Sequence, residues 1–290
     1  MHVQPNPAAA IGFILIGSAF FAGTSLMAKV LGHDSLGPPL HSMQISFGRF
    51  LFAFLFFLVV TAILRPEFKN INLRLQIGRS ACGWAGVTLM FASVAYIPLP
   101  DATAISFLNP VFAMILAIPM LGERVGPVRW GASVLALIGA MVLLRPTPDS
   151  FQPAALLALG AAIMLGFEAN LVKMLTGREK PLQILIVNNA IGLVIASVAV
   201  FFVWIPATAA QWGVLAALGV MMALGQTCFI QAMRRADASF VMPFIYATLI
   251  FATLYDYLFY ATLPDFISIL GAAIIVSGAM ILAWRQARLR

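Results

Sequence analysis

Ten apolar segments, each about 20 residues long, are the feature that most limits what this 290-residue chain can fold into. A helix needs roughly 20 mostly apolar residues to cross the hydrocarbon core of a membrane. The segments are separated by short polar, Gly or Pro breaks and cover residues 9–31, 41–64, 77–97, 101–121, 126–145, 154–176, 181–204, 211–234, 238–260 and 264–285. The sequence therefore predicts an all-α membrane protein with ten transmembrane helices.

Composition supports a membrane protein and excludes several other classes. Hydrophobic residues make up 62% of the chain and charged residues 9%, whereas soluble domains are about 45–50% apolar and about 25% charged. The net charge of +7 comes from cations that lie singly between apolar segments, so no nucleic-acid partner is expected. Cys82 and Cys228 lie in apolar segments without a CxxC motif or a nearby His at ligand spacing. We therefore expect neither a metal nor another cofactor.

The distribution of Lys and Arg predicts the orientation. In short loops, cations accumulate on the cytoplasmic side of the membrane. Arg145 is alone on one predicted side, and Lys29, Arg49 and Lys173 lie within spans. The side shared by both termini has the other 13 of the 17 cations: Arg65, Lys69, Arg74, Arg79, Arg124, Arg129, Arg178, Lys180, Arg234, Arg235, Arg285, Arg288 and Arg290. The pattern predicts a multi-pass protein of a bacterial-type inner membrane, with both termini cytoplasmic and no cleavable signal peptide.

The chain also repeats itself. The segment Asp101-Ala102-Thr103-Ala104-Ile105 returns as Asp237-Ala238-Ser239-Phe240-Val241, an offset of 136 residues. Residues 130–141 match residues 270–280 with a one-residue slip. The two units, 8–146 and 153–286, each contain five spans, and an odd number makes the second unit enter the membrane in the opposite sense. Inverted repeats of this kind place a substrate site near the midplane between the halves of a transporter.

Several motifs of the first unit resemble the EamA-type repeat of the drug/metabolite transporter superfamily. They are Asp101-Ala102-Thr103, Asn109-Pro110-Val111-Phe112, Leu121-Gly122-Glu123-Arg124 and the segment from Trp130-Gly131 to Gly139. The second unit departs from this pattern, since Ala261-Thr262 replaces Gly-Glu and Tyr246 stands at the position of Pro110. The resemblance implies a 5+5 helix arrangement and export of small metabolites, with aromatic or other neutral amino acids and their derivatives as the nearest substrate class.

Ionisable residues inside the spans are candidates for function because a charge in the bilayer is costly, by about 2.5–3.5 kcal/mol on insertion scales. Glu168 is either a carboxylate that binds a proton or a substrate amine, or half of a structural ion pair with Lys173 or Arg49. Arg49 is either a ligand for a substrate carboxylate or the partner of Glu168. Lys173 lies close enough to a span end for its amine to reach the membrane surface.

Polar and aromatic residues at midplane depth form a second set of candidates. They could bind a substrate or could hydrogen-bond neighbouring helices, and the sequence leaves both roles open. The polar candidates are Ser18, Thr88, Asn109, Asn170, Asn188, Gln226, Thr227 and Tyr246, and the apolar wall candidates are Trp84 and Phe107. Pro110 and Pro243 lie within spans and are candidate hinges.

Absent motifs narrow the choice of function. The chain has no GxxxxGK[ST] phosphate loop, no HExxH and no GxSxG, and no segment resembles the filter of a channel. The prediction is a secondary transporter, not an enzyme, that works by alternating access in a lipid bilayer. Its partners are a small-molecule substrate and, as candidate coupling ions, protons. The alternatives are a transporter of a sugar, a nucleotide-derived metabolite or a lipophilic cation and, after these, a channel or an intramembrane enzyme.

Overall fold

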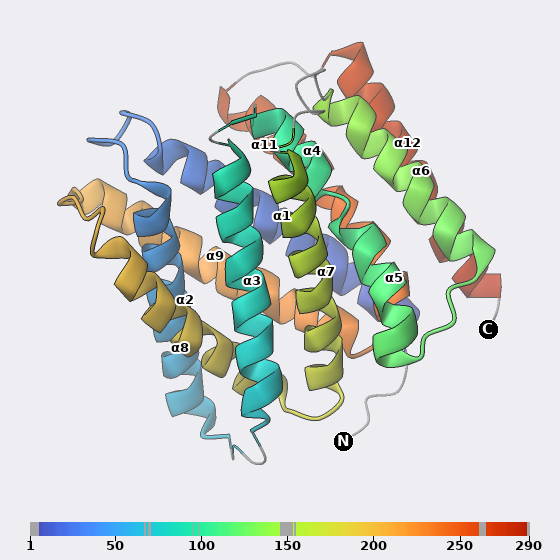
Figure 1. The fold of residues 1–290 in the computed structure, drawn as a ribbon, viewed down its shortest axis with the longest axis horizontal. Coiled ribbons are helices and arrows are strands. Elements are labelled where there is room, and N and C mark those ends of the chain that lie inside the picture. The colour runs from blue at the N-terminus through green and yellow to red at the C-terminus, as the bar shows by residue number, and fades with distance from the viewer. Residues whose placement is uncertain are drawn as a thin grey trace.

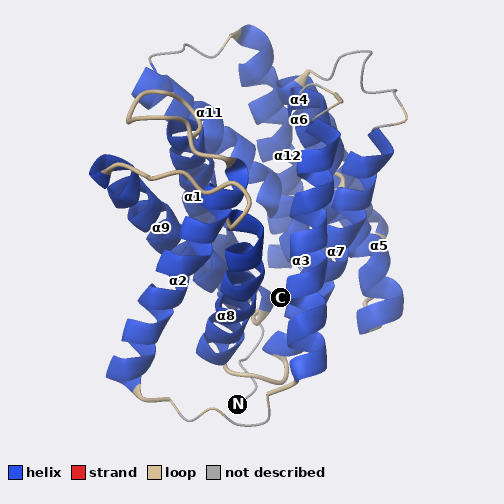
Figure 2. Ribbon diagram, turned by 60° about the vertical axis from the view of Figure 1, so that its left-hand side comes forward, coloured by secondary structure: helices blue, strands red, loops and turns tan. Residues whose placement is uncertain are grey.

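Helices build every regular part of the computed structural model, which describes residues 6–66, 68, 71–94, 96–97, 99–145, 153, 155–260 and 265–288 (Figure 1). No strand occurs in these ranges, as Figure 2 shows. The elements are α1 (Pro7–Leu31), α2 (Ser42–Leu64), α3 (Leu73–Val94), α4 (Leu99–Ser106), α5 (Asn109–Leu121), α6 (Pro127–Leu144), α7 (Ala155–Thr176), α8 (Pro181–Val200), α9 (Ala209–Met233), α10 (Ala238–Val241), the 3₁₀ helix η2 (Met242–Tyr246), α11 (Ala247–Tyr260) and α12 (Phe266–Arg288).

Nine helical segments within these ranges are long and apolar enough to cross a membrane. They correspond to nine of the ten predicted spans. The tenth, α3, has 22 residues and is less apolar because it contains Arg74 and Arg79. The architecture is thus that of a multi-pass membrane protein, and α3 lies within the same bundle (Figure 1).

Two of the predicted continuous spans are interrupted in the structure. Residues 101–121 divide into α4 and α5, with a turn at Phe107 and Leu108. Pro110 has no N–H to donate to the carbonyl of Ser106, and the side chain of Asn109 donates to that carbonyl instead, over 3.0 Å. In the second half, Pro243 lies in η2 between α10 and α11. Both candidate hinge prolines therefore lie at breaks of regular α-helix.

Helix α3 begins four residues earlier than predicted. Asn72 caps its first turn by accepting a hydrogen bond from the N–H of Leu75 through Oδ1, over 3.2 Å. The earlier start places Arg79 inside the helix, where only 2% of the side chain is exposed. The prediction that Arg79 belongs to the cation-rich loops is therefore wrong. Helix α8 ends at Val200, four residues before its predicted end.

Packing between helices follows the two-fold repeat of the sequence. Helix α1 packs against α9 and α11, and the corresponding α7 packs against α3 and α5. Helix α2 contacts its counterpart α8, and α6 lies along its counterpart α12. At the α6–α12 crossing, a Cβ added to Gly139 would lie 2.8 Å from the carbonyl oxygen of Gly271. These glycines let the two helix backbones approach closely.

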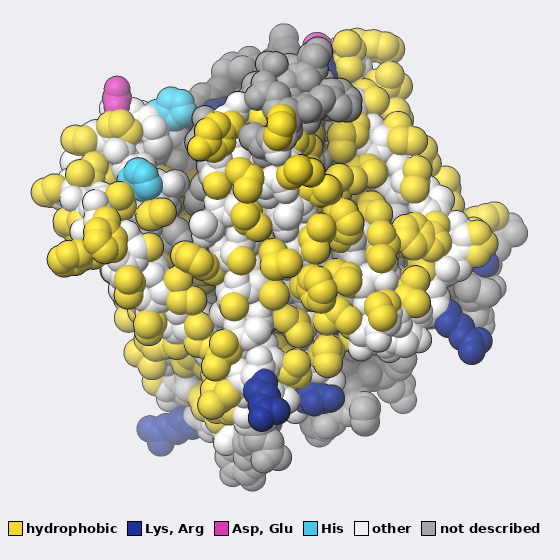
Figure 3. Space-filling view, viewed as in Figure 1, with side chains coloured by type: hydrophobic (Ala, Val, Ile, Leu, Met, Phe, Trp, Pro, Cys, Tyr) yellow, Lys and Arg dark blue, Asp and Glu magenta, His cyan; other side chains and the backbone are white. Residues whose placement is uncertain are grey.

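Helix α1 begins and α12 ends on the same side of the bundle, the lower right in Figure 1, which we call the terminus end. In the same view, Figure 3 shows a broad apolar surface along the helices, while Lys and Arg side chains gather mainly at the lower edge. An apolar belt of this kind suits contact with lipid tails. That the terminus end faces the cytoplasm stays a prediction.

Candidate functional site

The candidate site is a cavity of about 380 Å³ between the two halves of the chain. Side chains from α1, α2, α3, α5, α7, α8, α9 and η2 line it. The lining residues are Phe21, Ser46, Arg49, Phe50, Arg79, Ser80, Gly83, Trp84, Val87, Asn109, Leu165, Glu168, Ala169, Asn188, Gly192, Met222, Gln226, Phe229, Met242 and Ile245. Because both halves contribute, a relative movement of the halves would change the shape of this cavity.

Three charged side chains meet in the cavity. The Nε of Arg79 lies 3.7 Å from Oε1 of Glu168, whose side chain is 27% exposed. Arg49 is attracted electrostatically to the same carboxylate, and its guanidinium carbon lies 4.2 Å from the centroid of the Phe50 ring. Two guanidinium groups thus share one carboxylate. With all three ionised, the cavity has a net charge of +1.

Glycines make room for this arrangement. A Cβ at Gly83 would lie 3.0 Å from the carboxyl carbon of Glu168, so the carboxylate rests directly on the α3 backbone surface. A Cβ at Gly192 would lie 2.2 Å from the Phe50 ring. Glu168 and Phe50 can therefore occupy these positions because the residue facing each of them is a glycine, Gly83 of α3 and Gly192 of α8.

Amide side chains form the polar part of the wall. The Oδ1 of Asn188 accepts a hydrogen bond from the hydroxyl of Ser80 over 3.0 Å. The Oε1 of Gln226 accepts from Nδ2 of Asn189 over 3.1 Å. These bonds fix the orientation of two amides at the cavity, while Phe21, Phe50 and Phe229 contribute aromatic surface. Such a site combines apolar walls with a few oriented polar groups, as small-molecule sites usually do.

A comparison with protein families decides what kind of protein has this cavity. The profile of the EamA-like transporter family matches the chain twice, at residues 8–145 and 152–284. The chain belongs to the EamA-like transporter family. It is thus a member of the drug/metabolite transporter superfamily and a transporter of small molecules, as the resemblance indicated.

Relatives of this EamA-like transporter have different substrates. It is 32% identical to a riboflavin transporter of Vibrio cholerae, over 80% of this chain and 82% of the relative. It is 31% identical to a riboflavin transporter of Rhizobium johnstonii, over 99% of this chain and 95% of the relative. An S-adenosylmethionine uptake transporter of Rickettsia bellii is 25% identical, over 95% of this chain and 94% of the relative.

A solved crystal structure shares the fold of this EamA-like transporter. It superposes with a TM-score of 0.83 at 15% sequence identity, covering 96% of this chain and 98% of the other. At that identity the similarity supports the helix arrangement, whereas the substrate must be argued from the cavity and from the nearer relatives.

The structure brings six of the predicted site residues together in the cavity: Arg49, Trp84, Asn109, Glu168, Asn188 and Gln226. Six others are absent from its described lining: Ser18, Thr88, Phe107, Asn170, Thr227 and Tyr246. Of these, Asn170 donates to the carbonyls of Ala113 and Gly166, and Tyr246 donates to the carbonyl of Phe107 over 2.8 Å. Such bonds between and within helices are the packing role that the sequence left open.

The cation nearest to Glu168 is Arg79, which the sequence did not predict as its partner. The amine of Lys173 donates instead to the carbonyls of Met233 and Ala236. The predicted ion pair between Glu168 and Lys173 is therefore wrong. A periodic signal could have identified Arg79, since Arg79, Gly83 and Val87 recur every four residues and so share one face of a helix.

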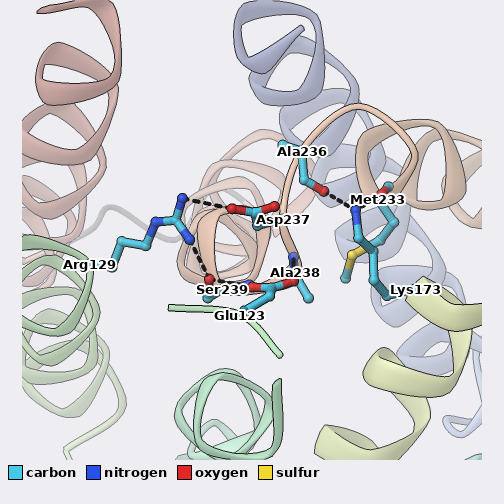
Figure 4. A network of polar contacts seen from close by, with 8 residues as sticks. All are labelled: Glu123, Arg129, Lys173, Met233, Ala236, Asp237, Ala238 and Ser239. Atoms are coloured by element: carbon cyan, nitrogen blue, oxygen red, sulfur yellow. Dashed lines mark hydrogen bonds and ion pairs between the residues drawn. The ribbon is translucent and has the colours of Figure 1, made fainter. Parts of the chain in front are cut away.

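A second polar cluster joins residues of the two halves, as Figure 4 shows. It lies at the terminus end, close to Arg235, whose carbonyl accepts a hydrogen bond from the N–H of Asn6. The carboxylate of Glu123, between α5 and α6, accepts hydrogen bonds from the N–H groups of Ala238 and Ser239 over 2.8 and 3.0 Å. It also accepts one from the Ser239 hydroxyl. Arg129 of α6 donates to Asp237 over 2.9 Å and to the Ser239 hydroxyl over 2.7 Å. We call Glu123, Arg129, Asp237 and Ser239 the terminus-end clamp.

The clamp lies close to the cavity in the sequence. Ser239 lies three residues before Met242, which lines the cavity. In the second repeat, Thr262 stands at the position of Glu123, so that unit has no carboxylate at the corresponding place. At the opposite end of the bundle, other carboxylates connect the halves, Asp256 with Lys29 and Asp265 with Arg145.

Proposed function

We propose that this EamA-like transporter moves riboflavin, or a similar flat heteroaromatic metabolite, through the central cavity by alternating access. The observation that carries the substrate class is the similarity to two riboflavin transporters over 80% and 99% of the chain. In this proposal the units 8–146 and 153–286 are inverted repeats that rock against each other in an inner membrane. The cation-rich terminus end supports a cytoplasmic location for both termini.

The chemistry of the cavity suits a flavin ring. Fused aromatic rings stack favourably on aromatic side chains, and Phe21, Phe50 and Phe229 present such surfaces. Carbonyl oxygens on a ring edge need donors, which the guanidinium groups of Arg49 and Arg79 supply. Hydroxyls of a sugar-like chain need partners that both donate and accept, and the amides of Asn188 and Gln226 can do both.

Export of aromatic or other neutral amino acids is the second candidate function. It is favoured by the juxtaposition of Glu168 with Arg49 and Arg79, because a zwitterion presents an ammonium to the former and a carboxylate to the latter. The cavity would then hold an aromatic side chain against its apolar wall. The two functions differ in the substrate, and the second one is export, whereas the test below asks for riboflavin import.

Expression in a bacterium that can neither make nor import riboflavin tests the proposal. If the chain imports riboflavin, cells should grow at low external riboflavin with the wild-type gene but not with an empty vector. Failure to grow, with the protein present in the membrane, would contradict riboflavin import. Increased resistance to toxic aromatic amino-acid analogues in the same cells would instead support amino-acid export.

A further inference from the structure

We infer that Arg79 is the substrate anchor of this transporter, and that it binds an acceptor oxygen on the edge of the substrate. This inference rests on the proposed transport function and adds to it the residue that selects the charge of the substrate. The geometry around the guanidinium carries the argument.

Arg79 has buried donors without acceptors. Its side chain is 2% exposed, and neither Nε nor Nη1 has a hydrogen-bond partner among the described residues. Buried polar groups are almost always hydrogen-bonded in proteins, and an unsatisfied one is destabilising, more so when it is charged. A buried guanidinium that lines a cavity and has two nitrogens without acceptors therefore indicates that a ligand supplies them.

Glu168 balances the charge of Arg79 without satisfying its donors. The Nε to Oε1 distance of 3.7 Å exceeds that of a hydrogen bond. The carboxylate instead rests against Gly83, where an added Cβ would lie 3.0 Å from it. Glu168 thus acts as a counter-ion beside Arg79, and both side chains contribute to the lining of the cavity.

The charges around Arg79 define the class of group that it takes. Arg49 and Arg79 together outnumber Glu168, so a neutral or anionic acceptor is attracted and a net cation is repelled. The planar guanidinium fork suits two neighbouring oxygens or an oxygen beside a ring nitrogen. The flavin edge that carries a carbonyl oxygen beside an unprotonated ring nitrogen and a phosphate group both meet this description, whereas a cationic sulfonium compound does not.

Binding measurements on the purified protein test the inference, with riboflavin, flavin mononucleotide and S-adenosylmethionine as probes. The variants are Arg79→Gln, which removes the charge, and Arg79→Lys, which keeps the charge but not the fork. Arg74→Gln is the matched control, because Arg74 lies exposed on the same helix. Size-exclusion chromatography and melting temperature report whether each variant folds.

We expect Arg79→Gln to bind flavins at least about tenfold more weakly than wild type, since hydrogen bonds to charged groups contribute about 1.5–3 kcal/mol. Arg79→Lys should bind them several-fold more weakly, and Arg74→Gln should match wild type. The preference for flavin mononucleotide over S-adenosylmethionine should shrink in Arg79→Gln, a change that a purely structural role of Arg79 would not produce.

Flavin binding that is unchanged in folded Arg79→Lys and Arg79→Gln would overturn the inference while leaving the proposed function intact. If Arg79→Gln does not fold, an unchanged flavin affinity in Arg79→Lys overturns the inference by itself, because that variant lacks the guanidinium fork. A wild-type protein that binds no flavin would overturn the proposed function, and the inference with it.

Discussion

Replacing Glu123 with Gln should weaken the terminus-end clamp and make the cavity more accessible from that end. The Glu123 carboxylate accepts three hydrogen bonds from the start of α10. An amide has one oxygen to accept them and presents N–H groups to the remaining donors. Loss of one hydrogen bond to a charged group is worth about 1.5–3 kcal/mol, which corresponds to a shift of roughly 10- to 150-fold in the equilibrium between closed and open forms.

Thiol labelling measures this shift. Cys228 packs against Gly17 of α1, so Cys82 and Cys228 are both replaced by Ala, and Met222→Cys then places the only thiol in the cavity lining. In membrane vesicles, a membrane-impermeant thiol reagent added from the terminus end should label this cysteine at least about tenfold faster in Glu123→Gln than in the background protein. The labelling rate should rise in proportion to the population of the open form, because the reagent reacts with that form.

The control breaks an ion pair at the opposite end of the bundle. Lys29 at the end of α1 lies 2.9 Å from Asp256 of α11, and Asp256→Asn should not increase labelling from the terminus end. An equal increase in Asp256→Asn, or no increase in a folded Glu123→Gln protein, would refute the assignment of the clamp as the closure of this end.

Three further predictions concern the cavity wall, a helix break and the end of the bundle opposite the terminus end. Gly192→Ala should lower substrate affinity without unfolding the protein, because the new Cβ would lie 2.2 Å from the present position of the Phe50 ring and displace it. Tyr246→Phe should lower stability in detergent by about 1–3 kcal/mol, measured by denaturant unfolding, because it leaves the carbonyl at the α4–α5 turn without its donor. Arg145, with help from a Ser268 hydrogen bond, holds the pKa of Asp265 well below its usual range. The stability contribution of this carboxylate is present above its unfolded pKa and is lost as the pH falls through the folded value. Any stability difference between wild type and Asp265→Asn should therefore be constant from pH 5 to 8.

Each of these predictions has a result that would contradict it. Gly213→Ala is the control for the cavity wall, because a Cβ there would meet nothing within 4 Å, and equal loss of affinity in both Gly variants would argue against the role of Phe50. A Tyr246→Phe protein as stable as wild type would show that the hydroxyl is dispensable. A melting-temperature difference for Asp265→Asn that changes between pH 5 and 8 would contradict the depressed pKa.

The helix arrangement was predictable because the hydrocarbon core imposes one length scale on every span. Apolar runs of about 20 residues located the spans, and the Asp-Ala repeat indicated two related units. Helix ends that depend on single hydrogen bonds were less predictable. Asn72 starts α3 four residues early, and the side chain of Asn109 replaces the hydrogen bond that Pro110 cannot donate.

The candidate site was predictable only in part, for a related reason. Depth along a span identified Glu168 and Arg49 as charges in the membrane, and the structure places both in the cavity. Depth does not report which face of a helix a residue occupies, so Asn170 and Tyr246 were grouped with the cavity although they hydrogen-bond to backbone carbonyls outside it. Arg79 was misplaced because its cationic side chain, near a span end, resembles a loop residue.

Counterflow in liposomes tests the central claim, that the cavity between the halves transports a flavin-like substrate, most directly. Purified protein is reconstituted with unlabelled riboflavin inside, and uptake of labelled riboflavin is measured with wild type and with the cavity-wall variant Gly192→Ala. The account predicts saturable uptake that external flavin competes for and that the variant performs with a higher half-saturation concentration. Absence of counterflow in folded wild-type protein, or uptake that neither saturates nor responds to the variant, would contradict it.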